Sequence, residues 1–173
     1  MKELYLFKMA YKIRIILDVE NDVIRDIVID KTINLEDFHL IIAKSFGFKG
    51  QEMASFYKTD NNWEQGEEIP LFDMSENGDS IAMNSFLVND VFKNVGDKLI
   101  YVYDFMAMWT FFVELSEISE DEIKDFKITF SFGNTPDQAP EKKFIAEKLD
   151  DDFDVFEDEN NFENIDDFDF ENY

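Results

Sequence analysis

The chain has 173 residues, and its 40 Asp and Glu against 16 Lys and Arg give a formal net charge of -24. A charge of this sign repels the phosphate backbone, so we do not expect direct nucleic-acid binding and expect any partner to be a basic protein. The hydrophobic content of 45% is sufficient for a folded core, and the absence of Cys excludes disulfides, thiolate nucleophiles and zinc sites built on sulfur.

The first third of the chain predicts a β-hairpin followed by a helix. Apolar and polar residues alternate over 11–18, and β-branched residues fill 23–29, with a polar run between the two segments. Asn34 can cap a helix whose first turn is acidic, whose apolar residues recur on one face, and which ends at Gly47.

The rest of the folded part predicts short strands with little additional helix. A loop is expected at 76–85 and a short second helix at 89–93. Strands are expected at 53–58, 69–72, 99–105, 109–115 and 126–132. A sheet of this kind with one main helix across it predicts an α+β fold, with a mixed or antiparallel sheet in a β-grasp-like or small-roll arrangement.

The acidic residues gather at the C-terminal end. Residues 149–173 contain twelve Asp and Glu and no Lys or Arg, so half of the net charge lies in this segment. We predict a domain at 1–135 and a linker with a disordered acidic tail at 136–173. The tail is expected to be a solubilising extension, to dock on basic residues of the domain, or to bind a basic partner through Phe anchors. These anchors are Phe153, Phe156, Phe162, Phe168 and Phe170.

No segment predicts export or membrane insertion. Residues 1–10 carry charges among the apolar residues and lack a small-residue cleavage site, which is not typical of a signal peptide. The most apolar stretch without charge, 105–113, is about half of the ~18 residues that a membrane span needs. We therefore expect a cytoplasmic protein with no membrane association.

Two segments carry ordered motifs. The first has Leu35, then Phe38-His39 and Ile42, then Phe46-Gly47-Phe48 and Phe56; the second is Tyr101-Val102-Tyr103-Asp104-Phe105 followed by Trp109. The order and spacing of these residues resemble those of the plasmid pRiA4b ORF-three-like domain family. The patterns of that family are Leu-x-x-Leu-His in the first segment and Tyr-x-Tyr-Asp-Phe-Gly-Asp-x-Trp-x-His in the second. The resemblance covers roughly residues 11–115 and implies the α+β fold of the family and a link to mobile elements.

The sequence departs from the family pattern at three polar places. The second His of the pattern, its Gly-Asp pair and its last His fall on Glu52, Met106-Ala107 and Phe111. If relatives use a cluster of His and Asp for metal binding or catalysis, the resemblance implies that this chain retains only His39 and Asp104 of it.

The second motif also forms a candidate interaction surface. It consists of aromatic residues with neighbouring methionines and one acid: Tyr101, Tyr103, Asp104, Phe105, Met106, Met108 and Trp109. Strand alternation sends Tyr101, Tyr103 and Phe105 to one face, where packing in the core is the simplest interpretation and exposure for recognition is the alternative. Asp104 is expected to cap a turn, and the sole histidine, His39, to pack at the margin of the helix's apolar face.

Other chemistry is weakly indicated. The glycines form no phosphate cradle, and the run Asp150-x-Asp152-x-Asp154 lacks the Gly and Glu of a calcium loop, so no cofactor or metal is predicted. The leading hypothesis is a non-enzymatic protein-interaction module. The alternatives are a metal-dependent or hydrolytic enzyme with a degenerate site, and an acidic nucleic-acid mimic that binds a basic protein. The oligomeric state is left open.

Overall fold

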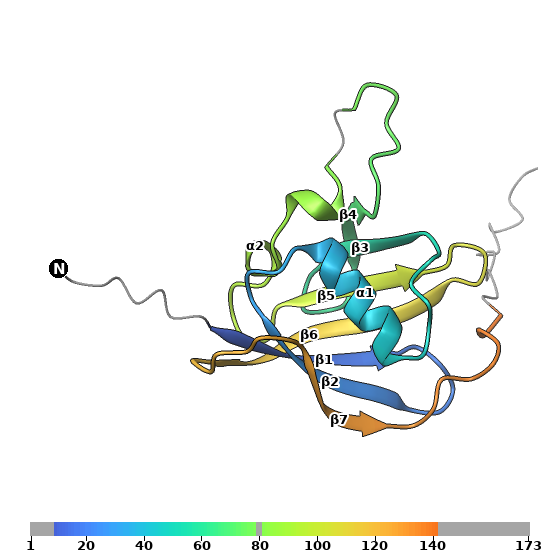
Figure 1. Ribbon diagram of the computed structural model, residues 1–173. Helices are drawn as coiled ribbons and strands as arrows, with labels where there is room; N and C mark the ends of the chain where they lie inside the picture. Colours follow the sequence, from blue (N-terminus) through green and yellow to red (C-terminus); the bar gives the residue numbers. More distant parts are fainter. Residues whose placement is uncertain (1–8, 79–80, 142–173) are drawn as a thin grey trace, which may run out of the picture. The chain divides into compact units, whose positions relative to one another are not determined.

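The computed structural model describes residues 9–78 and 81–141, and its seven strands form a single sheet (Figure 1). The strands are β1 (Ala10–Leu17), β2 (Val23–Asp30), β3 (Ala54–Thr59), β4 (Gln65–Pro70), β5 (Lys98–Tyr103), β6 (Trp109–Ser119) and β7 (Lys127–Phe132). The order is β4-β3-β5-β6-β1-β2-β7, and each neighbouring pair is antiparallel. The predicted α+β class with one main helix is confirmed, whereas the β-grasp-like or small-roll arrangement stays a prediction.

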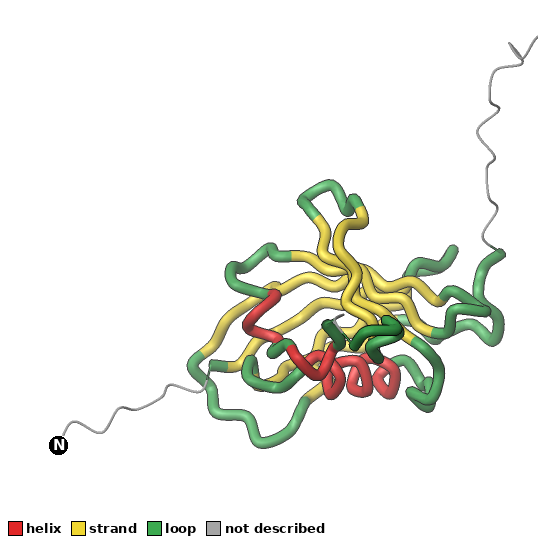
Figure 2. The backbone as a smooth tube through the Cα atoms, turned by 90° about the horizontal axis from the view of Figure 1, so that it is seen from above, coloured by secondary structure: helices red, strands yellow, loops and turns green. Residues whose placement is uncertain are grey.

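The main helix, α1 (Leu35–Ser45), crosses one face of this sheet. Its N-terminus is capped as predicted, since Asn34 Oδ1 accepts the backbone N–H of Asp37 at 2.8 Å. Two shorter pieces, the 3₁₀ turn η1 (Met83–Ser85) and α2 (Val88–Val91), follow β4 in the chain. Figure 2 shows the helices on one side of the strands, so the core lies between α1 and the sheet.

Aromatic rings fill the space between α1 and the sheet. Phe38 stacks on Phe56 of β3 with ring centroids 5.5 Å apart, and Phe46 packs edge-on against Phe111 of β6 at 4.9 Å. The β1 side chains at positions 11, 13, 15 and 17 are buried, because strand alternation turns them toward this core. Offset and edge-on aromatic pairs of this kind add to the stability that burial alone provides.

Several predicted boundaries differ from the structure. The strand predicted at 99–105 ends at Tyr103, because the backbone turns at Asp104, which has φ of 60°. The strand predicted at 69–72 begins four residues earlier, at Gln65, and the predicted loop at 76–85 includes η1. The predicted tail with its Phe anchors lies outside the described residues.

Candidate functional site

A buried hydrogen bond joins His39 of α1 to Tyr101 of β5. The distance from His39 Nδ1 to the Tyr101 hydroxyl is 2.6 Å, and neither residue is more than 1% exposed. Burial lowers the pKa of His39 to about 4, although a hydrogen bond to the backbone of Gly50 acts in the opposite direction. The ring is therefore neutral near pH 7, and burial raises the pKa of Tyr101 well above its usual value. His39 lies deeper than the margin predicted for it.

The neighbouring Tyr103 fixes the loop that follows α1. Its hydroxyl oxygen accepts backbone N–H groups of Gly50, Gln51 and Glu52 at 3.1, 3.2 and 3.4 Å. The ring of Tyr103 lies 6.1 Å from that of His39, centroid to centroid. Tyr103 therefore contacts two of the positions at which the family pattern has a histidine, 39 and 52. The core packing predicted for Tyr103 agrees with its 3% exposure.

The turn between β5 and β6, residues 104–108, is held by the carboxylate of Asp104. Its Oδ1 accepts the backbone N–H of Met106 at 3.1 Å and of Ala107 at 3.4 Å, and its carbonyl accepts the N–H of Met108 at 2.6 Å. Asp104 and Met108 have φ of 60° and 58°, in the left-handed region that side chains other than Gly rarely adopt. The expectation that Asp104 caps a turn agrees with this geometry.

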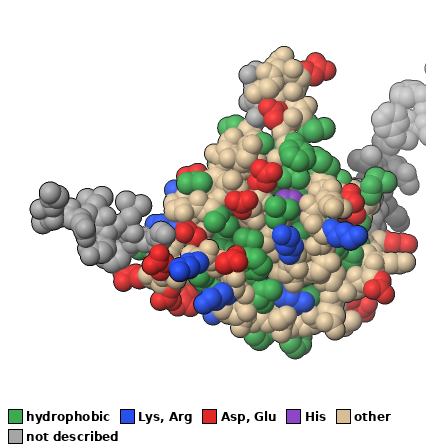
Figure 3. Space-filling model, viewed as in Figure 1, with side chains coloured by type: hydrophobic (Ala, Val, Ile, Leu, Met, Phe, Trp, Pro, Cys, Tyr) green, Lys and Arg blue, Asp and Glu red, His purple; other side chains and the backbone are tan. Residues whose placement is uncertain are grey.

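The candidate interaction residues divide into a buried and an exposed group. Tyr101, Tyr103 and Trp109 are at most 6% exposed and belong to the core. Phe105, Met106 and Met108 lie on the turn and are 42%, 96% and 39% exposed. The predicted alternation that placed Phe105 beside Tyr101 and Tyr103 is therefore wrong, because the strand ends before Phe105. On the face shown in Figure 3, apolar side chains reach the surface at several separate places among charged ones.

His39 and Asp104 are not brought together into a shared pocket among the described residues. His39 bonds to Tyr101, whereas Asp104 bonds to the backbone of its own turn. Neither residue lines the hollow beside the β3–β4 hairpin or the hollow at the C-terminal end of α1. With 1% of its surface exposed, the imidazole of His39 presents almost no area to a substrate in this conformation.

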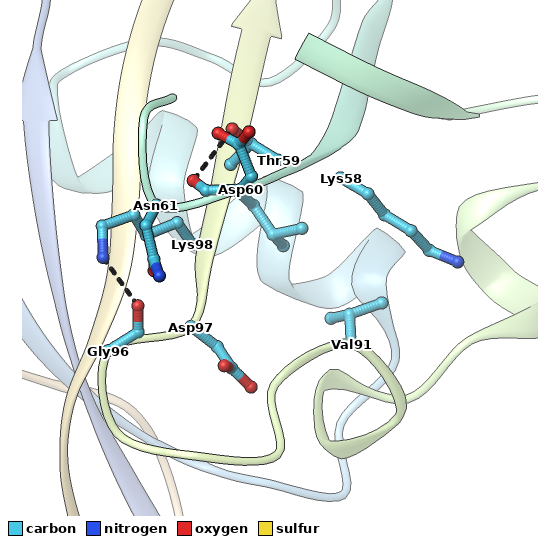
Figure 4. Close-up of a pocket in the computed structure, with 9 residues that line it drawn as sticks. Lys58, Thr59, Asp60, Asn61, Val91, Gly96, Asp97 and Lys98 are labelled. Carbon is cyan, nitrogen blue, oxygen red and sulfur yellow. Dashed lines mark hydrogen bonds between the residues drawn. The ribbon is translucent and has the colours of Figure 1, made fainter. Parts of the chain in front are cut away.

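A polar hollow of about 360 Å³ lies between the β3–β4 hairpin and the start of β5 (Figure 4). It carries Lys58, Asp60, Asp97 and Lys98. Asp60 Oδ1 accepts backbone N–H groups of its own turn, and Asp97 Oδ2 accepts those of residues 93 and 94. These carboxylates therefore shape two loops, and the charges of the four side chains balance.

Within residues 9–78 and 81–141, no three His, Asp or Glu side chains come together in a way that could hold a metal ion. No described helix combines the length and the apolar character that crossing a membrane requires.

Comparison with known proteins identifies the family. Residues 9–161 match the family described as plasmid pRiA4b ORF-3-like protein. The chain belongs to this family. The resemblance seen in the motifs is confirmed, and the family match extends beyond the expected end near residue 115 and into the acidic segment. No curated protein matches.

A solved structure shares the fold of this family member. It is the crystal structure of the protein of unknown function MM3350 from Methanosarcina mazei Go1, with a TM-score of 0.59 and 16% sequence identity. The similarity covers 71% of this chain and 69% of that chain. Similarity at this identity supports a common fold alone, so the arguments about function rest on the residues of the present chain.

Proposed function

We propose that this pRiA4b ORF-3-like protein is a non-enzymatic interaction module, and that the β5–β6 turn is its contact site for a partner protein. The observation that carries the proposal is the exposure of three large apolar side chains on one short turn, with Met106 96% exposed. Exposed apolar groups concentrated in one place are typical of interaction sites, and Met adapts its shape to different partner surfaces.

The backbone of the turn is already ordered before any partner binds. Two residues other than Gly hold left-handed conformations, which cost on the order of 1–3 kcal/mol each and persist only where surrounding structure enforces them. Here the Asp104 carboxylate and the adjoining strands supply that constraint. A preordered apolar turn loses little conformational entropy on binding, which favours affinity.

The partner is proposed to be basic. The net charge of -24 attracts positively charged surfaces over long range, and half of it lies in the acidic tail. In this scheme the tail increases the rate of encounter, and the turn supplies short-range apolar contact. The proposal includes a link between this protein and mobile elements, which the family resemblance implies.

The enzyme alternative has less support. It needs a titratable group that a substrate can reach, and the sole histidine is 1% exposed with its Nδ1 bonded to Tyr101. The nucleic-acid mimic alternative rests on the acidic charge alone and shares the proposed basic partner.

A photo-crosslinking amino acid at position 106 tests the proposal, with position 74 as the matched control. Met74 is 77% exposed and belongs to the loop after β4, a different segment of the chain from the turn. We expect a specific adduct from position 106 and none from position 74, and we expect Met106→Asp, but not Met74→Asp, to abolish binding of that partner. Equal adducts from both positions would contradict the proposal. Release of the partner by duplex DNA would favour the mimic alternative.

A further inference from the structure

A second hollow, of about 560 Å³, lies at the C-terminal end of α1. The end of α1, the strand β2 and the segment 134–137 form its walls, and Arg25, Lys44, Phe46 and Phe48 are among the residues that line it. Thr135 closes one side, because its hydroxyl donates to the carbonyl of Phe46 at 2.8 Å. The hollow is therefore built from three parts of the chain that are distant in sequence.

Arg25 is the buried cation of this hollow and is 8% exposed. Its Nε donates to the Ser45 carbonyl at 3.0 Å, and its Nη1 donates to the carbonyls of Ile24 and Phe132 at 2.9 and 3.0 Å. The guanidinium carbon lies 5.2 Å above the centre of the Phe46 ring. These bonds use three of the five N–H donors of the side chain, and Nη2 donates to no described residue.

No carboxylate pairs with Arg25 in the described part of the chain, although the protein has 40 acidic residues. A buried charge normally has a counter-ion, because removing it from water costs several kcal/mol as an order of magnitude. Burial accordingly lowers the pKa of Arg25. The three carbonyls accept hydrogen bonds but carry no net charge, so no ion pair compensates the positive charge of Arg25 within the described residues.

The charges around the hollow favour a singly charged anion. Lys44 adds a second cation at the rim, and Asp137 is the acid that lines the hollow. One negative charge on a ligand would balance this set, whereas a doubly charged phosphate would exceed it. The free Nη2 can donate a charge-assisted hydrogen bond to a carboxylate oxygen, and the half-buried ring of Phe48 offers apolar surface to an attached organic group.

We infer that this hollow is a binding site for a small organic monocarboxylate, with Nη2 of Arg25 as its principal donor and Lys44 as a secondary cation. The site goes beyond the proposed interaction through the β5–β6 turn and shares no residue with it. The bonds from Arg25 to Ser45 and Phe132 also tie α1 to β7, so the test must separate ligand binding from this structural role.

The experiment is a titration of the full-length, ¹⁵N-labelled protein with benzoate, followed by NMR of the Arg25 Nε–H and the backbone amides of residues 133–137. Benzamide, which has the same shape without the charge, is the matched control. We expect saturable shifts with benzoate and none with benzamide. Acetylglycylphenylalanine compared with benzoate shows whether a polypeptide C-terminus or a free acid binds more tightly.

Two exposed substitutions keep the test independent of folding. Lys44→Gln should weaken benzoate binding about two- to fivefold, and Asp137→Asn should strengthen it by a similar factor, as expected for single exposed charges near a ligand. Arg25→Lys should abolish binding while the unchanged amide spectrum elsewhere reports an intact fold. The inference would be overturned by an absence of benzoate-dependent shifts, by equal shifts with benzamide, or by affinities unchanged in both charge variants.

Discussion

His39 connects the main helix to the centre of the sheet through a bond across 62 residues of sequence. Burial of both partners means that each polar atom depends on the other for its hydrogen bond. An unsatisfied buried polar atom costs about 1–3 kcal/mol, so the bond between His39 and Tyr101 stabilises the core.

The lowered pKa of His39 makes stability depend on pH. The unfolded chain binds a proton at His39 below pH 6.5, whereas the folded protein does so only near pH 4, so acidification favours unfolding. The stability is fully present above pH 6.5 and is lost as the pH falls toward 4. We expect a loss of about 2 kcal/mol at pH 5 relative to pH 8, which His39→Gln should remove. Urea unfolding of both proteins at the two pH values measures it.

The comparison of the two proteins is needed because many carboxylates also titrate in this range. Their contribution is shared by wild type and variant and therefore cancels in the difference. Parallel stability curves for the two proteins would show that His39 is not the group responsible.

Asp104 combines a left-handed backbone with the acceptor that closes the β5–β6 turn. Asp104→Ala should cost about 1–2 kcal/mol, because it removes the acceptor and places a less tolerant residue at positive φ. Asp104→Asn keeps the side-chain acceptor and tolerates positive φ, so it should cost less. Asp104→Gly relieves the backbone strain but lacks the acceptor, so its cost should reflect the lost hydrogen bonds alone. Thermal unfolding of the three variants ranks these effects. Equal melting temperatures for Ala and Asn would show that the side-chain acceptor has no role.

At the scale of the elements, the end of β7 depends on Gly133. Its φ is 73°, and a Cβ at this position would lie 2.2 Å from the carbonyl oxygen of Asp22. Gly133→Ala should cost about 2–4 kcal/mol, because the backbone of β7 would have to move away from β2. Gly78 is the matched control, since its φ is 67° but nothing lies within 4 Å of the added Cβ, so Gly78→Ala should cost about 1 kcal/mol. Urea midpoints of the two variants test the difference.

Most elements could be predicted because their signals are local. Alternation identified β1, β-branched residues identified β2, and the Asn34 cap with the closing Gly47 identified α1 to within two residues. The β5–β6 turn was predicted, but its start was placed two residues too late, because Phe105, Met106, Ala107 and Met108 include none of the usual turn residues. There the capping carboxylate and the pairing of the two strands override local preference.

The candidate sites were harder to predict because their partners are distant in sequence. Nothing near His39 indicates that Tyr101 is its partner. Likewise, an arginine within the apolar strand β2 was a usable signal, but the three carbonyls around Arg25 come from β2, α1 and β7. Such arrangements follow from the strand order, which periodicity does not determine.

For the whole molecule, residues 9–141 should fold without the tail. Every described strand and helix ends by Phe132, and the described segment from 133 contacts the end of α1 through Thr135. A truncation after residue 141 should therefore retain the cooperative unfolding and the melting temperature of the full chain. Calorimetry of the two proteins measures this, and a truncated protein without a cooperative transition would contradict the predicted domain.

The tail should act through charge first and through Phe second. Deletion of residues 149–173 should abolish a salt-sensitive interaction, because exposed charges are screened within about 8 Å at physiological ionic strength. Replacing its five anchors Phe153, Phe156, Phe162, Phe168 and Phe170 with Ser should weaken the interaction but leave its salt dependence. Affinity for the crosslinked partner at two salt concentrations measures both effects. An affinity unchanged by deletion at either salt concentration would show that the tail is only a solubilising segment.

The strand β7 ends the sheet, and all six of its residues are exposed, including Ile128, Phe130 and Phe132. An open strand of this kind is a template on which another chain can add by backbone pairing. The charge of -24 therefore has a second consequence, since mutual repulsion between copies of the protein opposes such pairing at neutral pH. Near the isoelectric point of about 4.1 this protection disappears. The acidic residues proposed to attract a basic partner are thus the same residues that keep the protein in solution. Substitutions that neutralise them to weaken partner binding should also promote aggregation.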